Sequence, residues 1–185
     1  MPELLGAGNG HLLLGDELPA QGDHLFDIHV GAKLADYDSM LVYSHFKGHN
    51  MAGYGGCLKN MAIGCASSQY GKEQVHGGGW SRETFIDRLA EAGKGVACHF
   101  GESIAYINVL ANLSVDCDCV DNPAMPAIPD IGILGSLDPV AVEQAALDML
   151  EAQAPKSALL NRIAACRGRG QITAMRRLCL LYTSR

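Results

Sequence analysis

The sequence lacks the features that mark several common classes of protein. No apolar run reaches the roughly 18 residues that a membrane-spanning helix requires. Residues 1–10 contain no basic segment followed by an apolar one, so no secretory signal is visible. No two cysteines are separated by two residues, which excludes a ferredoxin-type cluster loop and a zinc ribbon. We therefore expect a cytoplasmic protein with no membrane partner.

Charge and cysteine content narrow the class further. Twenty acidic residues outnumber 14 basic ones, and the net charge of -6 argues against nucleic acid as a partner. The seven cysteines are an odd number without a secretory signal, a pattern typical of reduced thiols in the cytoplasm. Hydrophobic residues make up 48% of the chain, which is enough for a folded core.

Short apolar, β-rich runs alternate with helical patterns. Residues 39–43, 104–110 and 131–134 are predicted strands, and residues 53–66 are a predicted helix that begins after a glycine-rich turn. This alternation predicts an α/β fold. We expect a partial parallel or mixed sheet with flanking helices, truncated at its N-terminus.

Two helices have recognisable start signals. Ser81 is the expected N-cap of the first helix. Asp138 followed by Pro139 predicts the start of a second helix that runs to about Gln153. The apolar faces expected on these helices contain Phe85, Leu89, Ala92 and Val96 in the first and Val142, Ala145, Ala146 and Met149 in the second.

The C-terminal residues differ from the rest of the chain. Residues 168–185 contain four arginines, no acidic residue and no coherent hydrophobic period. The final residues resemble sequencing-adapter read-through rather than protein-coding sequence. We expect residues 1–167 to be a fragment of a single α/β domain, and residues 168–185 to be a non-native tail that makes few packed contacts.

The densest group of polar residues follows the first predicted strand. His45 and His49 lie four residues apart and are candidates for catalytic acid and base. Lys59 is the candidate cofactor anchor, and the start of the helix before it offers free N–H groups to a phosphate. The alternative is a solvated surface loop. Three glycines are expected to admit a ligand closely: Gly53, Gly55 and Gly56.

A second group follows the second predicted strand. Cys117 and Cys119, flanked by Asp116 and Asp118, could bind a soft metal ion. The alternative is a pair of buried cysteines beside capping aspartates, because free cysteine is among the most buried residue types. Loops that follow parallel strands gather at one edge of a sheet, so we expect this group to lie near the His45–Lys59 group.

Three blocks of the sequence resemble a known family. SHFKGHNMAGYGGCLKNMAIGCAS, YINVLANLSVDCDC and PDIGILGSLDPVAVEQAALDML resemble the signature blocks of the domain of unknown function 362 family, whose members are often described as Fe–S centre proteins. The resemblance covers roughly residues 36–162. Family members usually have a large region before the first strand, and many have two ferredoxin-type cysteine loops after the position of His76. This chain lacks both, so the Fe–S description does not transfer on its own residues.

The segment from His45 to Lys59 is also similar to a motif of the lactate racemase family, although Leu58 replaces its usual arginine. This resemblance implies that His49 is a catalytic acid/base and that Lys59 holds a nickel pincer nucleotide. It also implies that His76 ligates nickel. We therefore expect the side-chain nitrogens of His49, Lys59 and His76 to lie within about 10 Å of one another, with His45 in the same concave pocket.

Three functional interpretations remain open. The first is an enzyme that acts on a small organic acid through a His/Lys site, with a nickel- or iron-containing cofactor. The second is a non-catalytic redox or metal-binding protein of the Fe–S-associated kind that uses Cys117 and Cys119. The third is a scaffold whose polar loop packs against the missing N-terminal region of the parent protein. The first two predict a small-molecule ligand or cofactor as partner.

Overall fold

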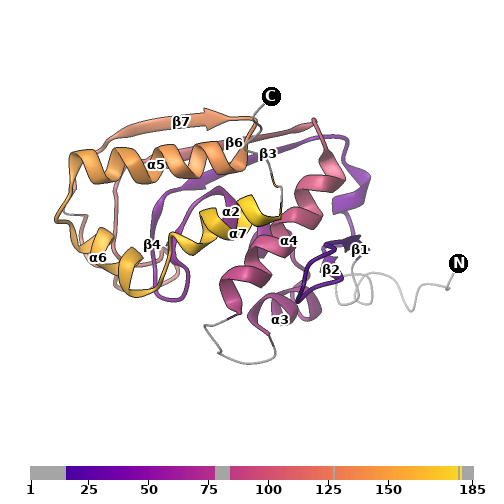
Figure 1. Cartoon of the computed structure of the whole chain (residues 1–185). Coiled ribbons are helices and arrows are strands. Elements are labelled where there is room, and N and C mark those ends of the chain that lie inside the picture. The colour runs from indigo at the N-terminus through magenta and orange to yellow at the C-terminus, as the bar shows by residue number, and fades with distance from the viewer. Residues whose placement is uncertain (1–15, 78–83, 127, 179, 181–185) are drawn as a thin grey trace, which may run out of the picture.

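The computed structural model describes residues 16–77, 84–126, 128–178 and 180, and shows a mixed α/β fold (Figure 1). Strand β3 (Met40–His45) pairs in parallel with β6 (Ile104–Leu110), which pairs antiparallel with β7 (Gly132–Ser136). The three form one sheet in the order β3-β6-β7. The predicted fold class is therefore confirmed, as are the strands expected at residues 39–43 and 104–110.

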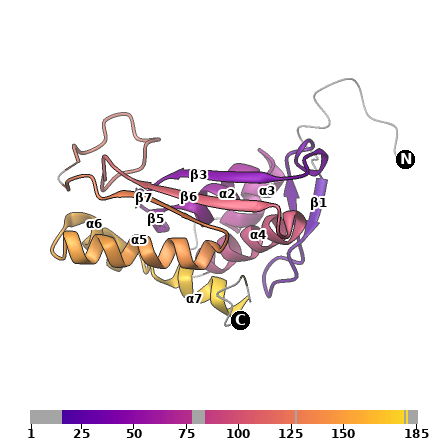
Figure 2. The same cartoon turned by 90° about the horizontal axis from the view of Figure 1, so that it is seen from above.

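Helices cover one face of this sheet and leave the other exposed (Figure 2). Helix α2 (Cys57–Cys65) packs on β3, α5 (Pro139–Gln153) packs on β6 and β7, and α4 (Phe85–Phe100) packs against α2. Alternate residues of β6 are buried, as expected for a strand with one face toward a core. On the opposite face, Leu41, Tyr43 and Ile133 are between 59% and 67% exposed.

Smaller elements lie beside this sheet. Strands β1 (Asp16–Pro19) and β2 (Asp27–Val30) pair antiparallel. The short helix η1 (Leu34–Asp36) follows β2 in the chain, and helix α3 (Tyr70–His76) packs against β2. The predicted helix at residues 53–66 is partly wrong, because its first residues form β5 (Gly53–Gly55), which pairs with β4 (Lys47–His49). Two helices end the described chain: α6 (Ala158–Ala165) and α7 (Gly170–Arg177).

The predicted start of α5 is confirmed. Oδ1 of Asp138 accepts the backbone N–H groups of Val140 and Ala141 at 2.8 and 3.0 Å, and the helix ends at Gln153. Its buried face is rotated from the expected one, since Ala145 and Met149 are only half-buried. Leu147 and Leu150 are fully buried instead. The helix thus presents to the sheet a face that also contains one acidic residue, Glu143.

Replacing Asp138 by alanine is expected to lower the free energy of unfolding by about 1 kcal/mol, because two N–H groups lose their acceptor. Chemical denaturation measures the change. Asp148→Ala on the same helix is the control, since it removes one exposed bond from Gln144 and should cost only about 0.3 kcal/mol. Equal losses in the two variants would refute the capping role.

The start of α4 is described only in part. Ser81, the expected N-cap, lies outside the described residues, and the helix begins at Phe85. The apolar face predicted for this helix is confirmed, because all four of its residues are buried: Phe85, Leu89, Ala92 and Val96.

The expectation that residues 168–185 make few packed contacts is wrong for their described part. Helix α7 packs against α4 and α5, and Ile172, Met175 and Leu180 are buried. Ile172 and Met175 are three residues apart, so they lie on one face of the helix, which the arginine-rich composition obscured. Leu181 lies outside the described residues, and the non-native origin of the tail stays a prediction.

Candidate functional site

The β4–β5 hairpin follows the carboxyl end of β3 directly. Lys47 pairs with Gly55 and His49 with Gly53, so the lysine and the histidine share one face of β4. Gly48 faces the other way and approaches the 114–119 loop so closely that a Cβ there would lie 1.9 Å from the carbonyl oxygen of Val115. A glycine is therefore required at position 48 for the hairpin and the loop to pack.

The two polar groups of the sequence meet at this edge of the sheet. Asp118 lies 3.1 Å from Nδ1 of His45 and 2.9 Å from Nζ of Lys47. The backbone N–H of Gly48 donates to the carbonyl oxygen of Ser114 at 2.8 Å. Partial burial raises the pKa of Asp118, but hydrogen bonds from Lys47 and His45 outweigh it and leave this pKa below its usual value. The expected proximity of the groups is confirmed, because parallel β3 and β6 end side by side.

Both ring nitrogens of His45 are engaged in this contact. Nδ1 faces Asp118, and Nε2 lies 2.8 Å from the carbonyl oxygen of Ala111. Neither nitrogen is free to exchange a proton with a ligand in this arrangement. His45 thus fastens the 111–118 loop to the end of β3, and its catalytic role stays a prediction.

His49 is held as a neutral imidazole. Its Nδ1 accepts the backbone N–H groups of Met51 and Ala52 at 3.2 and 3.1 Å, so the proton of the neutral ring resides on Nε2. Burial is the largest cause of a low pKa at His49, and together with the positive charges of Lys59 and Lys47 and smaller effects of His76 and Arg162 it lowers this pKa to about 4. At neutral pH the ring therefore offers an uncharged N–H donor among cationic groups.

Lys59 differs from the other cations near His49. Lys47 pairs with Asp118, and Arg162 on α6 lies 3.7 Å from Asp116. Lys59 is half-buried in the first turn of α2, and within the described part of the chain it has no hydrogen bond and no ion pair. Its charge reaches His49, Cys117 and Cys119. A lysine that lies partly in the fold and has no counter-ion is a natural place for an anionic ligand.

Packing explains two of the three glycines that were expected to admit a ligand. Gly53 has a φ of +82°, and a Cβ there would lie 2.7 Å from Cα of Gly168. A Cβ on Gly56 would lie 2.5 Å from Oε2 of Glu143. At Gly55 the nearest atom is Cδ of Lys59 at 3.8 Å, an ordinary contact distance. Of the three positions, Gly55 alone would accept a Cβ without a clash, and that Cβ would contact the side chain of Lys59.

The N-terminus of α2 does not offer the expected phosphate site. Oε1 of Glu143 accepts the backbone N–H of Leu58 at 3.0 Å and so occupies the position expected for the anion. Complete burial raises the pKa of Glu143 to about 7, a rise that the hydrogen bond from the Leu58 N–H limits. A phosphate would meet this carboxyl group and the filled space at Gly56. The only sequence signal for this buried acid is its place in the apolar face of α5.

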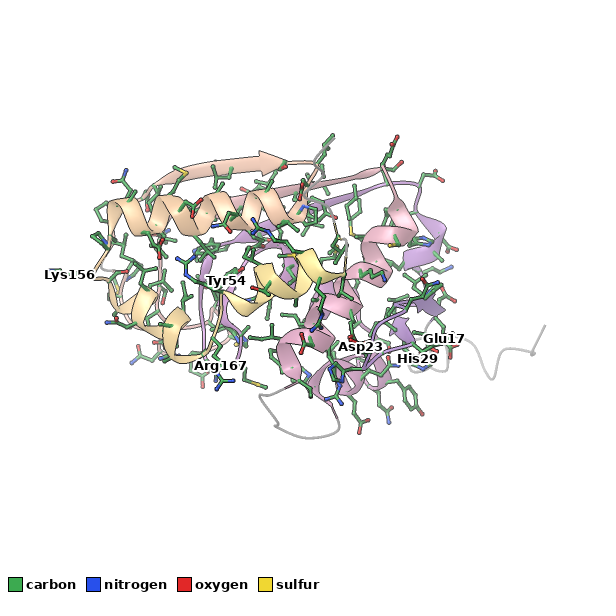
Figure 3. The ribbon with its side chains drawn as sticks, viewed as in Figure 1. Glu17, Asp23, His29, Tyr54, Lys156 and Arg167 are labelled. Atoms are coloured by element: carbon green, nitrogen blue, oxygen red, sulfur yellow. The ribbon has the colours of Figure 1, made fainter. Side chains whose placement is uncertain are left out.

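The tail residue Gln171 supports the site from behind. Gln171 is fully buried, and its Nε2 donates to the carbonyl oxygens of Ala52 and Tyr54 at 2.9 and 3.1 Å. Tyr54 is also fully buried, lies near the centre of the view in Figure 3, and its ring stacks on Phe46 at 5.1 Å. The sequence interpretation that set residues 168–185 aside missed this support.

The remaining predicted ligands occupy different surroundings. His76 ends α3, where Nδ1 lies 2.6 Å from the carbonyl oxygen of Lys72 and the ring lies 5.4 Å from that of Phe85. Cys117 is buried and Cys119 is exposed, with their Sγ atoms 2.8 Å apart. Among the described residues, no three His, Cys, Asp or Glu side chains are grouped to hold a metal ion. The metal-binding roles and the convergence of His76 with His49 and Lys59 stay predictions.

A cavity of about 480 Å³ lies elsewhere, between α4, α6 and α7. Its lining includes Asp87, Arg167 and Arg177 and none of the predicted site residues. The polar site is therefore a surface at the end of the sheet rather than this cavity.

The fold and the site define an α/β protein with a cationic site in a glycine-rich segment that follows a parallel strand. The model of the family described as Domain of unknown function (DUF362) matches residues 12–148, well over half of the chain. The chain belongs to this family. No curated protein and no solved structure matches it, so the resemblance to lactate racemase stays a hypothesis. Among the described residues, no helix is long and apolar enough to cross a bilayer.

Proposed function

We propose that this member of the family binds a small organic acid through Lys59 and His49. The observation that carries the proposal is the charge of the half-buried residue Lys59, which has no hydrogen bond or ion pair among the described residues and acts on a neutral His49. The chain as a whole has a net charge of -6, so a local excess of positive charge at this site favours anions of limited size. Lys47 and Arg162 add to this field although each has a carboxylate partner.

The two side chains supply complementary interactions to a carboxylate. Lys59 provides a charge-assisted hydrogen bond, and the Nε2–H of His49 provides a neutral one. A bound carboxylate favours the protonated form of His49, so the low pKa of the free site rises toward the range in which histidine exchanges protons. Acid binding would thereby make His49 competent for the proton transfer that the sequence predicted.

The residues do not fit a phosphate-bearing cofactor at the start of α2. Glu143 already accepts the Leu58 N–H there, and the described donors include no three-residue metal cluster. We therefore derive no step through a nickel nucleotide or another metal-bearing group. The proposed ligand is held by the side chains of Lys59 and His49.

Calorimetric titration with a panel of small mono- and dicarboxylates tests the proposal. Replacing Lys59 by methionine keeps its length and removes its charge, and is expected to weaken binding by about tenfold or more. The matched control is Lys156→Met, because Lys156 is an exposed lysine of the same chain (Figure 3) whose charge is not among the causes of the lowered His49 pKa. Wild-type affinity in Lys59→Met, or equal losses in both variants, would refute the site.

A further inference from the structure

The Cys117–Cys119 pair has the geometry of two sulfurs poised to react. The Sγ atoms are 2.8 Å apart, and the thiol of Cys119 donates to Cys117. A disulfide requires about 2.05 Å between the sulfurs, so the two atoms lie close to the bonding distance. This pair is distinct from Cys57, whose thiol is fully buried and directed at Asn108.

The surrounding turn holds the two cysteines together. The backbone N–H of Val120 donates to the carbonyl oxygen of Cys117 at 3.0 Å, which closes a turn around the pair. Asp118, between the cysteines, is anchored by Lys47 and His45. The loop is therefore fixed on both sides, and oxidation of the pair requires little loss of backbone freedom.

Exposure assigns different roles to the two sulfurs. Cys119 is exposed, whereas Cys117 is only 8% exposed. A reagent from solution therefore meets Cys119 first, and Cys117 is placed behind it to resolve the product. Access decides this order against an opposing effect, since the hydrogen bond from Cys119 raises the pKa of Cys119 and, despite burial, leaves the pKa of Cys117 below its usual value.

We propose that Cys117 and Cys119 form a redox-active dithiol that small disulfides such as oxidised glutathione convert to an intrachain disulfide. The Cys119 sulfur attacks one sulfur of the reagent, loses its proton and releases one glutathione thiolate. Cys117 then attacks Cys119 Sγ as a thiolate and releases the second glutathione. Two protein thiols and one glutathione disulfide thus become one protein disulfide and two glutathione molecules, with the electrons balanced. The proposal is independent of organic-acid binding.

Mass spectrometry after equilibration in glutathione buffers of increasing oxidation tests this site. The peptide that contains both cysteines should lose two hydrogens at a defined ratio of oxidised to reduced glutathione, while the free thiols elsewhere remain alkylatable. Cys117→Ser should accumulate one glutathione on Cys119, because no resolving sulfur remains. Cys119→Ser should react much more slowly, and Cys98→Ser should behave as wild type because Cys98 is exposed on another element, α4.

Three outcomes would overturn the proposal. The first is a pair that stays fully alkylatable in oxidised glutathione. The second is rapid glutathionylation of Cys117 in Cys119→Ser, which would reverse the assigned order. The third is a metal that purifies with the protein and protects both thiols until a chelator removes it, which would favour the metal-binding interpretation. Circular dichroism of each variant shows that the fold is retained.

Discussion

Replacing Glu143 by leucine is expected to lower the free energy of unfolding by about 2 kcal/mol at pH 6. Leucine has a similar size but no acceptor, so the buried N–H of Leu58 at the start of α2 loses its partner. The loss affects two helices, because Glu143 comes from α5 and Leu58 from α2. Urea denaturation at fixed pH measures it.

Glu143→Gln is the matched control for this effect. Glutamine retains a carbonyl oxygen for Leu58 and has no charge, so it should keep most of the stability at pH 6. An unchanged stability in Glu143→Leu would mean that another acceptor satisfies the Leu58 N–H. A glutamine variant as unstable as the leucine variant would also refute the acceptor role, because glutamine keeps an acceptor for the Leu58 N–H.

The same residue gives stability a defined dependence on pH. Its pKa rises from 4.5 in the unfolded chain to about 7 in the fold, so between these values the native state binds more protons than the unfolded state. The contribution of Glu143 is fully present below pH 4.5 and is lost as the pH rises through about 7. Glu143→Gln should remove this decline. A wild-type decline that persists in the variant would assign it to other groups.

The second large effect concerns the titration of His49. In a pH series of two-dimensional NMR spectra its ring signals should titrate near pH 4, whereas an ordinary histidine titrates near pH 6.5. Burial is the main cause, and Lys59 is the largest of the nearby charges. Lys59→Met should therefore raise the pKa of His49 without restoring the ordinary value.

Two controls distinguish charge from burial in this experiment. Lys156→Met should leave the His49 titration unchanged, because Lys156 is exposed and does not contribute to the lowered pKa. A carboxylate that binds wild-type protein should raise the pKa of His49, and Lys59→Met should weaken that response. A His49 pKa near 6.5 in the free protein would contradict the buried, cationic surroundings that the proposed function requires.

His49 and Glu143 have opposite effects on stability. The lowered pKa of His49 contributes stability that is present above pH 6.5 and is lost as the pH falls toward 4. Glu143 contributes stability that is lost as the pH rises through about 7. The two slopes therefore oppose each other between pH 4.5 and 6.5, and the decline due to Glu143 should be clearest between pH 6.5 and about 7, where His49 is neutral in both states.

The local signals in the sequence predicted several elements correctly. Asp138 before Pro139 specified the start of α5, and the run from Ile104 to Leu110 specified the strand that became β6. The rule that loops after parallel strands gather at one edge of a sheet also predicted that the loop of Asp118 lies near His45, and Asp118 contacts both His45 and Lys47. Each of these predictions depends on near neighbours in the chain or on a general rule of sheet topology.

Contacts between distant segments decided the features that were missed. Glu143 lies 85 residues from Leu58, whose backbone N–H it accepts. It therefore caps the start of α2 at the position where a phosphate was expected. Gln171 reaches residue 52, which is 119 residues away, and joined the supposed tail to the glycine-rich turn.

The sequence by itself determined the family, the strands β3 and β6, the start of α5 and the identity of the cationic side chains. Only the tertiary structure decided which of those side chains already have hydrogen-bond or ion-pair partners within the protein. His45 is bound at both ring nitrogens, whereas Lys59 has no partner among the described residues. The physical reason is that the cost of a buried polar group depends on its neighbours in space. No local sequence pattern specifies those neighbours.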